Sequence, residues 1–331
     1  MPASIGVDIG GTKVLAAAVD HTGRVLDTEA VETPGEGAGI ERATAAEVED
    51  ALVDVVGRLL AVHGRSPVGV AAAGVVDKDA QRVRFAPHLP WRDEPLSPRL
   101  TERLGNRILG DVLVDNDAAA ALWAEAHFGA AREVRDAVMI TLGTGIGGGL
   151  MVRGAIHRGS NGMAGEFGHM QMVPDGRECQ CGRRGCWEQY CSGRALARAA
   201  SDAGLELSGV ELTTAAREGD VAALASYDQV AHWLGVGVAN LVAAFDPPLV
   251  VIGGGVSAAS DLLLEGGRVS MTESLVGAGF RDLPELVSAE LGPLAGVIGI
   301  ADLARTAGRI RRVGRWGRAP SRVARGRARR R

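Results

Sequence analysis

The chain has 331 residues and a formal net charge of −4, with 36 lysines and arginines against 40 acidic residues. A chain of this length can bury a large core and is expected to form two domains. Its four cysteines do not suggest a disulfide framework, no apolar run is long enough for a bilayer, and no signal peptide precedes the first strand pattern, so we expect a cytoplasmic protein.

The first half of the chain predicts strands around one long helix. Period-two alternation and tight turns indicate an antiparallel meander of three strands, and a longer apolar spacing indicates the helix. Two buried strands follow, and the second leads into an alanine-rich helix. The expected strands are residues 4–9, 13–19, 24–31, 68–73 and 112–115, and the expected helices are 41–63 and 117 to about 128.

The second half repeats the succession of strand, glycine turn and strand. We expect strands at residues 137–142, 150–156 and 249–252, a glycine turn at 143–149, a helix at 221–245 and another helix opening at 253–255. This repeat indicates two related α/β domains that face each other across a cleft.

The charge is concentrated at the end of the chain. Residues 309–331 hold eleven arginines and no acidic residue, so the net charge of −4 divides into −15 for residues 1–308 and +11 for this tail. A segment of this composition is expected to be disordered. Such a tail can contact nucleic acid electrostatically, but charge runs are more often solvated extensions, so we do not expect that contact here.

One short segment carries the side chains of a metal site. Cys179, Cys181 and Cys186, together with His169, form a Cys3His set suited to closed tetrahedral structural zinc. The alternative is a group of free thiols with an unrelated histidine. Three of four cysteines within eight positions favour zinc, and the remaining Cys191 is expected to be buried.

Two glycine-rich turns, at residues 10–13 and 143–148, are candidate phosphate sites. The second matches the dinucleotide-binding pattern GxGxxG, but the strand expected after it argues against a Rossmann site. A Walker A sequence and the HRD and DFG segments of protein kinases are absent from the sequence. Each turn instead offers backbone N–H groups and a threonine hydroxyl, from Thr12 or Thr144, to phosphate oxygens.

Five motifs occur in the order typical of one family. They are Asp8-x-Gly-Gly-Thr-Lys13, Asn116-Asp117, Gly143-Thr-Gly-Ile-Gly-Gly-Gly149, Glu166-x-Gly-His169 and Cys179-x-Cys-Gly-x-x-Gly-Cys186-x-Glu188. With them, residues 4 to about 305 resemble the ROK (repressor, open reading frame, kinase) family. The resemblance implies an α/β architecture of the actin-like ATPase and hexokinase (ribonuclease H-like) fold, with two domains around a cleft.

The resemblance also implies domain boundaries and an activity. Residues 1–116 with about 296–308 would form a smaller domain, and residues 117–295 a larger one that contains the zinc loop 166–188. The implied reaction is the ATP-dependent phosphorylation of glucose at its 6-hydroxyl, in a homo-oligomer (dimer or tetramer). The alternatives are another hexose or an N-acyl amino sugar as substrate, polyphosphate as donor, or a sugar-responsive regulator. No helix-turn-helix precedes Asp8 in the sequence, which argues against the repressors of the family.

Phosphoryl transfer to a hydroxyl needs a proton acceptor, and the resemblance assigns that role to Asp117. The residues alone favour a helix N-cap, a position that Asp prefers. Asn116 can donate and accept hydrogen bonds and is expected beside a sugar hydroxyl. Glu166, Glu188 and His169 are expected sugar ligands, His169 through the ring nitrogen that zinc does not take.

The remaining expected contacts are less specific. Gly74 is expected to bring backbone close to the sugar, and His88 stands where many relatives have asparagine. Trp91 and Trp187 could line the pocket or simply pack. Asp8 is expected to orient Mg²⁺ through water. The expected ATP contacts are Gly10, Gly11, Thr12, Gly143 and Thr144 for the phosphates, Lys13 as added charge or an exposed strand residue, and Gly254 and Gly255 for adenosine or as a packing turn.

Overall fold

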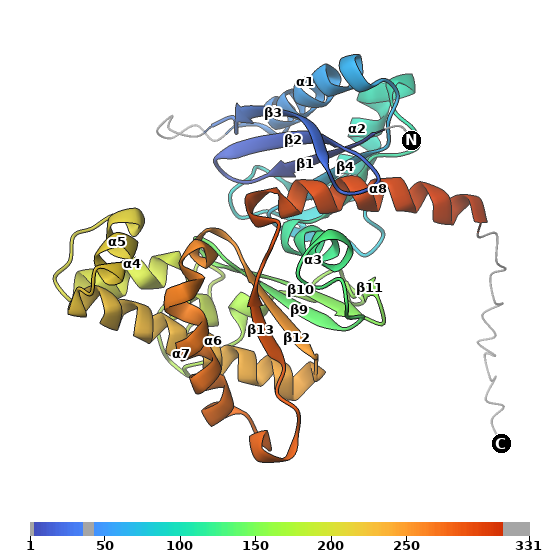
Figure 1. Ribbon diagram of the computed structural model, residues 1–331. Helices are drawn as coiled ribbons and strands as arrows, with labels where there is room; N and C mark the ends of the chain where they lie inside the picture. Colours follow the sequence, from blue (N-terminus) through green and yellow to red (C-terminus); the bar gives the residue numbers. More distant parts are fainter. Residues whose placement is uncertain (1–2, 36–42, 314–331) are drawn as a thin grey trace, which may run out of the picture.

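The computed structural model describes residues 3–35 and 43–313, and these contain two five-stranded sheets with the same topology (Figure 1). The first three strands of each sheet pair antiparallel, and the other neighbours pair parallel. This duplication was indicated by the repeat in the sequence. The first sheet has the order β3 (Val25–Glu32), β2 (Lys13–Val19), β1 (Ser4–Ile9), β4 (Val68–Ala72), β8 (Leu113–Asn116), and the second has the order β11 (Ala155–Ile156), β10 (Ile146–Val152), β9 (Ala137–Leu142), β12 (Leu249–Gly253), β13 (Glu285–Ser288).

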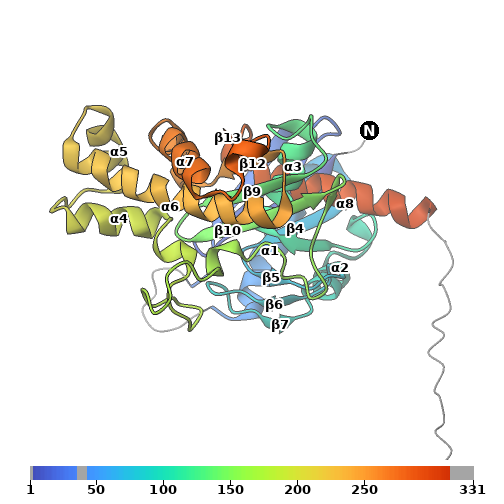
Figure 2. The ribbon, with the colours of Figure 1, turned by 90° about the horizontal axis from the view of Figure 1, so that it is seen from below.

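Each sheet has its own group of helices. The first packs against α1 (Ala45–His63), which contacts α2 (Leu96–Leu104), and a small sheet of β5 (Val75–Val76), β6 (Val83–Phe85) and β7 (Arg92–Glu94) follows β4. The second sheet shares its core with α4 (Gly193–Asp202), α5 (Gly209–Arg217), α6 (Val221–Phe245) and α7 (Ser260–Ser274). Figure 2 shows α4 and α5 at one end of the molecule, while α8 extends toward the other.

Two helices, α3 (Asp117–Phe128) and α8 (Ala295–Val313), pack together between the sheets. Glycines allow the close approach: a Cβ on Gly6 would lie 2.0 Å from the carbonyl oxygen of Val297, and one on Gly299 would lie 1.8 Å from that of Ala120. The last helix of the described chain therefore packs on the first sheet.

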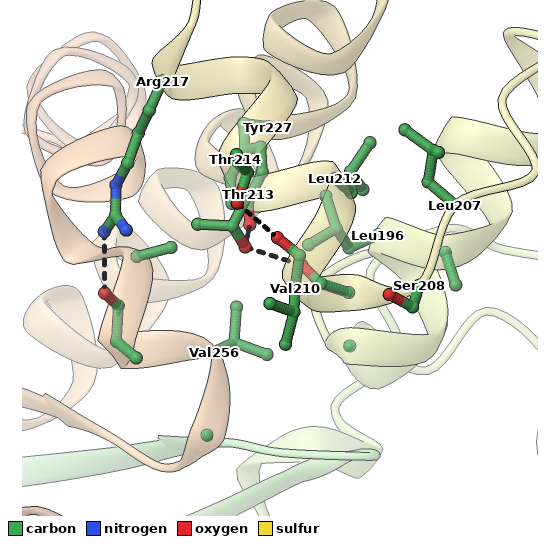
Figure 3. Close-up of a pocket in the computed structure, with 16 residues that line it drawn as sticks. Leu196, Leu207, Ser208, Val210, Leu212, Thr213, Thr214, Arg217, Tyr227 and Val256 are labelled. Carbon is green, nitrogen blue, oxygen red and sulfur yellow. Dashed lines mark hydrogen bonds between the residues drawn. The ribbon is translucent and has the colours of Figure 1, made fainter.

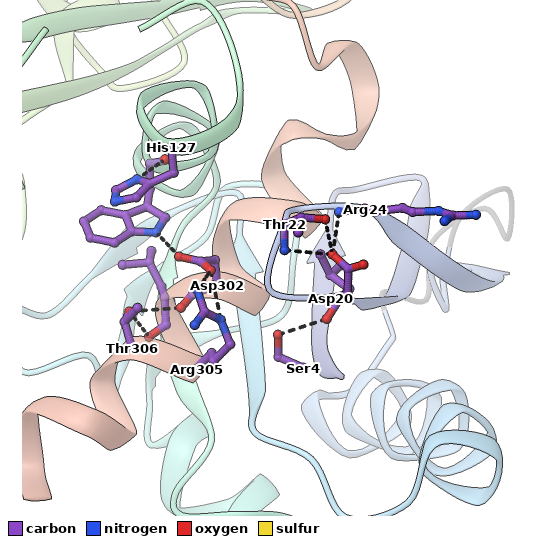
Figure 4. A network of polar contacts seen from close by, with 11 residues as sticks. Ser4, Asp20, Thr22, Arg24, His127, Asp302, Arg305 and Thr306 are labelled. Atoms are coloured by element: carbon purple, nitrogen blue, oxygen red, sulfur yellow. Dashed lines mark hydrogen bonds and ion pairs between the residues drawn. The ribbon is translucent and has the colours of Figure 1, made fainter. Parts of the chain in front are cut away.

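A polar network also joins α3 and α8 (Figure 4). The indole N–H of Trp123 donates to Asp302 at 3.0 Å, and Arg305 pairs with the same carboxylate, which is 2% exposed. His127 stacks on Trp123 with ring centroids 4.0 Å apart. Each polar group of this contact has a partner, so the helices can bury it without an uncompensated charge.

The second glycine turn is shorter than the sequence predicts. It covers only the residues between β9 and β10, because β10 begins at Ile146 and pairs Gly147, Gly148 and Gly149 with β9. The predicted strand 150–156 is broken after Val152 and resumes as β11. A Cβ on Gly148 would lie 2.3 Å from the Phe167 ring, so these glycines make room for close packing within a strand.

Other boundaries differ by a few residues. Thr44 forms a capping box with Glu47, so α1 begins at Ala45, and the predicted start at residues 41–42 lies outside the described part. Trp91 and Trp187 are fully buried and pack in the hydrophobic cores of the two halves. The backbone of α8 continues through residues 309–313, where the sequence predicts a disordered tail, and residues 314–331 lie outside the described part.

Among residues 3–35 and 43–313, none of the helices combines the length and the apolarity needed to traverse a bilayer.

Candidate active site

The ends of both sheets border one cavity of about 800 Å³, the main cavity. Asp8 stands near the end of β1, Gly74 follows β4, and Asn116 ends β8. Because β1, β4 and β8 are parallel, their carboxyl ends meet at one edge of the sheet, where α/β folds bind ligands. The second half contributes the turn after β9 and the segments around Glu166 and Glu188.

Most of the predicted site residues line the main cavity, and a few do not. Thr12 and Lys13 are exposed to solvent and do not line the cavity. Gly11 packs against His88, because a Cβ on Gly11 would lie 3.0 Å from the His88 Cβ. His88 itself lines the cavity. The predicted residues in the lining are Asp8, Gly74, Asn116, Asp117, Gly143, Thr144, Glu166, His169, Cys181, Glu188 and Gly254, whereas Gly10, Gly11, Thr12, Lys13 and Gly255 are not part of it.

The junction of β8 and α3 presents Asp117 to the cavity. Asn116 is the N-cap of α3: its side-chain oxygen accepts from the N–H of Ala119 at 3.0 Å, and its amide N–H donates to the Gly74 carbonyl at 3.1 Å. Asp117 is the first helical residue and accepts from the N–H of Ala118 at 2.9 Å. The N-cap interpretation of Asp117 is therefore wrong, because Asn116 holds that position, and the side chain of Asp117 lines the main cavity instead.

The two aspartates of the first sheet titrate unusually. Burial raises the pKa of Asp117 to about 6, against the lowering effect of the Ala118 N–H, and the charge of Glu166 raises it further. Burial and the charge of Asp117 raise the pKa of Asp8 to about 7. Solvent reaches part of each carboxyl from the cavity, but protein surrounds the rest. These acids suit proton acceptance near neutral pH and the binding of a cation.

A second group of acids lies across the cavity. Glu188 is 8% exposed and accepts from the Cys179 thiol at 3.2 Å. Glu166 lies 3.8 Å from Nε2 of His169, and burial raises the pKa of Glu166 against the opposing effect of His169. A Cβ on Gly145 would lie 2.4 Å from Glu188, so the glycine turn after β9 touches this acidic group directly.

The predicted metal ligands come together in the structure. One ligand atom from each of His169, Cys179, Cys181 and Cys186 can be chosen so that all lie within 4.8 Å of one another. The Sγ atoms of Cys181 and Cys186 are 3.6 Å apart, and Sγ of Cys179 is 3.7 Å from Nδ1 of His169. Tetrahedral zinc with Zn–S bonds of about 2.3 Å separates two sulfurs by about 3.8 Å, so this set fits zinc. Cys191 is fully buried, as predicted.

A second cavity of about 560 Å³ is lined by α4, α5 and the segment after β12 (Figure 3). Leu196, Val210 and Val256 give it apolar walls, and Tyr227 bonds to Thr213 at 2.7 Å inside it. It meets the main cavity at the glycine pair after β12, because Gly254 lines the main cavity and Gly255 the second. Gly254 has φ +84° and a Cβ there would lie 2.5 Å from the Leu142 carbonyl, so this turn requires glycine.

An ion pair between a buried carboxylate and a partly exposed arginine joins the two halves behind the site. Nε of Arg158, in the loop after β11, lies 3.0 Å from both oxygens of Asp115 in β8, and the side chain of Asp115 is 2% exposed. The same loop reaches the first half at Gly162, where a Cβ would lie 1.9 Å from the Val76 carbonyl. The sequence did not predict this pair. A charged residue inside a predicted buried strand indicates that a partner of opposite charge must lie nearby. It does not indicate which arginine that partner is.

Arg194 is a second residue that the sequence analysis missed. It lines the main cavity, and its Nε donates to the Thr144 carbonyl at 2.9 Å. It comes just after Ser192, which caps α4, and no motif of the sequence singles it out.

Comparisons with known proteins agree with this geometry. Residues 4–307 match the ROK family. The chain is 42% identical to the glucokinase of Streptomyces coelicolor, over 92% of this chain and 98% of that one. Among solved structures, it is similar to a ROK family glucokinase from Streptomyces griseus in complex with glucose and AMPPNP (TM-score 0.81, 42% identity, covering 92% of this chain and 99% of the other). It is also similar to a ROK hexokinase from Thermus thermophilus (TM-score 0.74, 33% identity, covering 93% and 99%). The chain shares the fold of these kinases and belongs to the ROK family.

Proposed function

We propose that this protein is an ATP-dependent glucokinase, which transfers the γ-phosphoryl group of ATP to the 6-hydroxyl of glucose. The observation that carries the proposal is the main cavity, which is lined by an aspartate of raised pKa, by the acidic residues Glu166 and Glu188, and by the glycine turn after β9. The similarity of this chain to the glucokinases of two Streptomyces species, one of them solved with glucose and AMPPNP, supports this choice of substrates.

Asp117 is the proposed base of the reaction. It accepts the proton of the 6-hydroxyl while the hydroxyl oxygen forms its bond to the γ-phosphorus, and the bond from that phosphorus to the bridging oxygen breaks to release ADP. Its carboxylate lines the main cavity, and one of its oxygens accepts a hydrogen bond from the Ala118 N–H, which orients the group for this proton transfer.

The sugar is proposed to lie against Glu166, Glu188 and His169, next to Asn116 and the backbone of Gly74. Carboxylates accept hydrogen bonds from hydroxyls, and charge-assisted bonds are about twice as strong as neutral ones. Since Nδ1 of His169 faces Cys179, its Nε2 is left for the sugar side of the cavity. Zinc held by His169, Cys179, Cys181 and Cys186 would shape this wall without contacting the phosphates.

The nucleotide is proposed to span both cavities. Adenine fits the apolar second cavity, and the phosphates would then pass Gly254 and Gly255 to reach Gly143 and Thr144. The turn that contains Gly10, Gly11, Thr12 and Lys13 packs against His88 at Gly11, and none of its four residues lines the cavity. Asp8 fits the role of holding Mg²⁺ through water, because its carboxylate lines the main cavity together with Asp117. When bound, Mg²⁺ would neutralise charge on the phosphate oxygens.

A coupled ADP-release assay across hexoses, N-acyl amino sugars and two donors tests the proposal. We expect turnover with glucose and ATP, and little with polyphosphate. D117A should abolish turnover and retain glucose binding in calorimetry. Activity confined to another sugar or donor, or full activity of D117A, would contradict the proposal.

The family resemblance further leads us to propose a cytoplasmic homo-oligomer, dimer or tetramer. Light scattering after size-exclusion chromatography measures the oligomeric state directly, and a monomer at micromolar concentration would contradict it.

A further inference from the structure

The main cavity has an unbalanced set of charges for a site that receives a nucleoside triphosphate. Asp8, Asp117, Glu166 and Glu188 all line it. Arg194 is the only lysine or arginine in its lining among the described residues. Phosphoryl transfer depends on positive charge near the phosphate oxygens, where negative charge is held in the transition state. Lys13, which the sequence offered for this purpose, is exposed and outside the cavity.

Arg194 is fixed where the glycine turn meets α4. The N–H of Gly193 donates to the Gly143 carbonyl at 2.8 Å, and Nε of Arg194 donates to the Thr144 carbonyl at 2.9 Å. Both bonds hold the start of α4 against the proposed phosphate turn. A guanidinium carries five N–H donors, so its two terminal nitrogens remain for a ligand.

The guanidinium also lies at the boundary between the proposed nucleotide side and the proposed sugar side of the cavity. A Cβ on Gly145 would lie 2.4 Å from Glu188, on the proposed sugar side, and 3.7 Å from a terminal nitrogen of Arg194. The phosphoryl group that moves from nucleotide to sugar must cross this boundary. Arg194 can therefore reach the phosphates from the side on which transfer takes place.

We propose that Arg194 binds the terminal phosphates of ATP and stabilises their charge during transfer, an inference that rests on the proposed function. A planar fork of donors suits phosphate oxygens better than a single ammonium group does. The competing explanation is that Arg194 only holds the turn in place through Thr144.

Arg198 provides a matched control for the test. It lies one turn further along α4, also donates to a backbone carbonyl, that of Gln189 at 2.9 Å, and lines neither cavity. The variants are R194Q, R194K and R198Q. Isothermal titration gives the Kd of Mg-ATP and of glucose, competition gives the Kd of adenosine, and steady-state kinetics give kcat.

R194Q should weaken Mg-ATP about tenfold to a hundredfold, the range for lost hydrogen bonds to a charged group, and should lower kcat. R194K should show a smaller loss because it keeps the charge. Adenosine and glucose affinities should stay within about twofold, since neither ligand carries phosphate, and R198Q should match the wild type. Retained glucose binding shows that R194Q is folded.

The proposal is overturned if R194Q binds Mg-ATP as tightly as R198Q does. It is also overturned if the affinity for adenosine falls in the same proportion as that for Mg-ATP, because the substitution would then have disrupted the structure of the turn and not a contact with phosphate. If R194Q does not fold, R194K against R198K decides: equal Mg-ATP affinities overturn the proposal. A wild-type protein that binds Mg-ATP but phosphorylates no hexose would contradict the proposed function, while the ATP titrations would still decide the role of Arg194.

Discussion

Asp8 and Asp117 share one cavity wall, and the charge of Asp117 makes it harder for Asp8 to ionise. Both residues were expected in the site because they belong to the motifs that resemble the ROK family, whereas the residues alone favoured an N-cap for Asp117. Which neighbour caps the helix was not predictable, because Asn116 and Asp117 both suit an N-cap. The choice depends on Gly74, whose carbonyl accepts a hydrogen bond from the side-chain amide of Asn116 and which lies in the turn between β4 and β5.

The raised pKa of Asp117 predicts an acid limb in the pH profile. The base acts when deprotonated, so kcat/KM for glucose should fall by about tenfold per pH unit below a pKa of about 6. Initial rates from pH 5 to 8 at saturating ATP measure this. A profile that is flat down to pH 5 would contradict the assignment.

The same shift predicts that Asp117 lowers stability at alkaline pH. Its folded-state pKa of about 6 lies above the ordinary 3.8, so its contribution favours folding at low pH and is lost as pH rises through about 6. D117N should therefore raise the free energy of unfolding at pH 8 by about 1–3 kcal/mol, with little change at pH 4.

Urea denaturation at the two pH values measures this difference. D228N, at an exposed position of α6, is the matched control and should behave as wild type at both. If D117N lowered the free energy of unfolding at pH 8, the folded protein would stabilise the ionised carboxylate, and this would contradict the raised pKa of Asp117.

The loop 157–165 and strand β8 are held together by Arg158 and Asp115, although they belong to different halves of the molecule. Elements with a strong local period, such as α6 at Val221–Phe245, were predicted to the residue. The glycines of β10 were assigned to a turn because their sequence shows the missing side chain but not the reason for it. For Gly148 that reason is the Phe167 ring, which a later segment supplies, and for Gly149 it is the close approach of α3 through the Ala118 carbonyl.

Breaking the pair between Arg158 and Asp115 should destabilise the fold. R158M leaves a buried carboxylate without its cation and should lower the free energy of unfolding by about 3 kcal/mol. D115N with R158M should recover much of this loss, since no uncompensated charge remains. A double-mutant cycle in urea measures the coupling, and additive effects of the two substitutions would contradict it.

The loop that carries the Cys3His set has little regular structure of its own. Only two 3-10 turns, at Phe167–His169 and Trp187–Gln189, are assigned between Glu166 and Gln189. We therefore expect one zinc per chain, and we expect its removal to raise KM for glucose or to unfold the loop, with adenosine binding retained.

Elemental analysis and kinetics before and after chelation check this expectation. C186S should lose zinc, whereas C191S, which changes the buried thiol outside the cluster, should keep it. Unaltered kinetics in verified zinc-free protein would refute a role for the ion.

At the scale of the whole molecule, two sheets of equal topology enclose the main cavity between their edges. The repeat in the sequence predicted this arrangement, and the family motifs predicted most of the lining. Arg194 shows what remained beyond reach, because it enters the cavity from the start of α4, outside the motifs of the site. The direction of its side chain depends on the contact of α4 with the turn after β9, which no local period encodes.

The place of α8 has a consequence for synthesis on the ribosome. Gly6 in β1 and Gly69 in β4 pack directly against the backbone of α8, at the carbonyl groups of Val297 and Ile300. Helix α8 therefore covers this face of the first sheet. The amino-terminal sheet therefore emerges with one face still bare and stays so until nearly the whole polypeptide has left the exit tunnel. A nascent chain arrested before residue 295 should be a substrate for chaperones that recognise apolar strands, and release of the final helix should end that dependence.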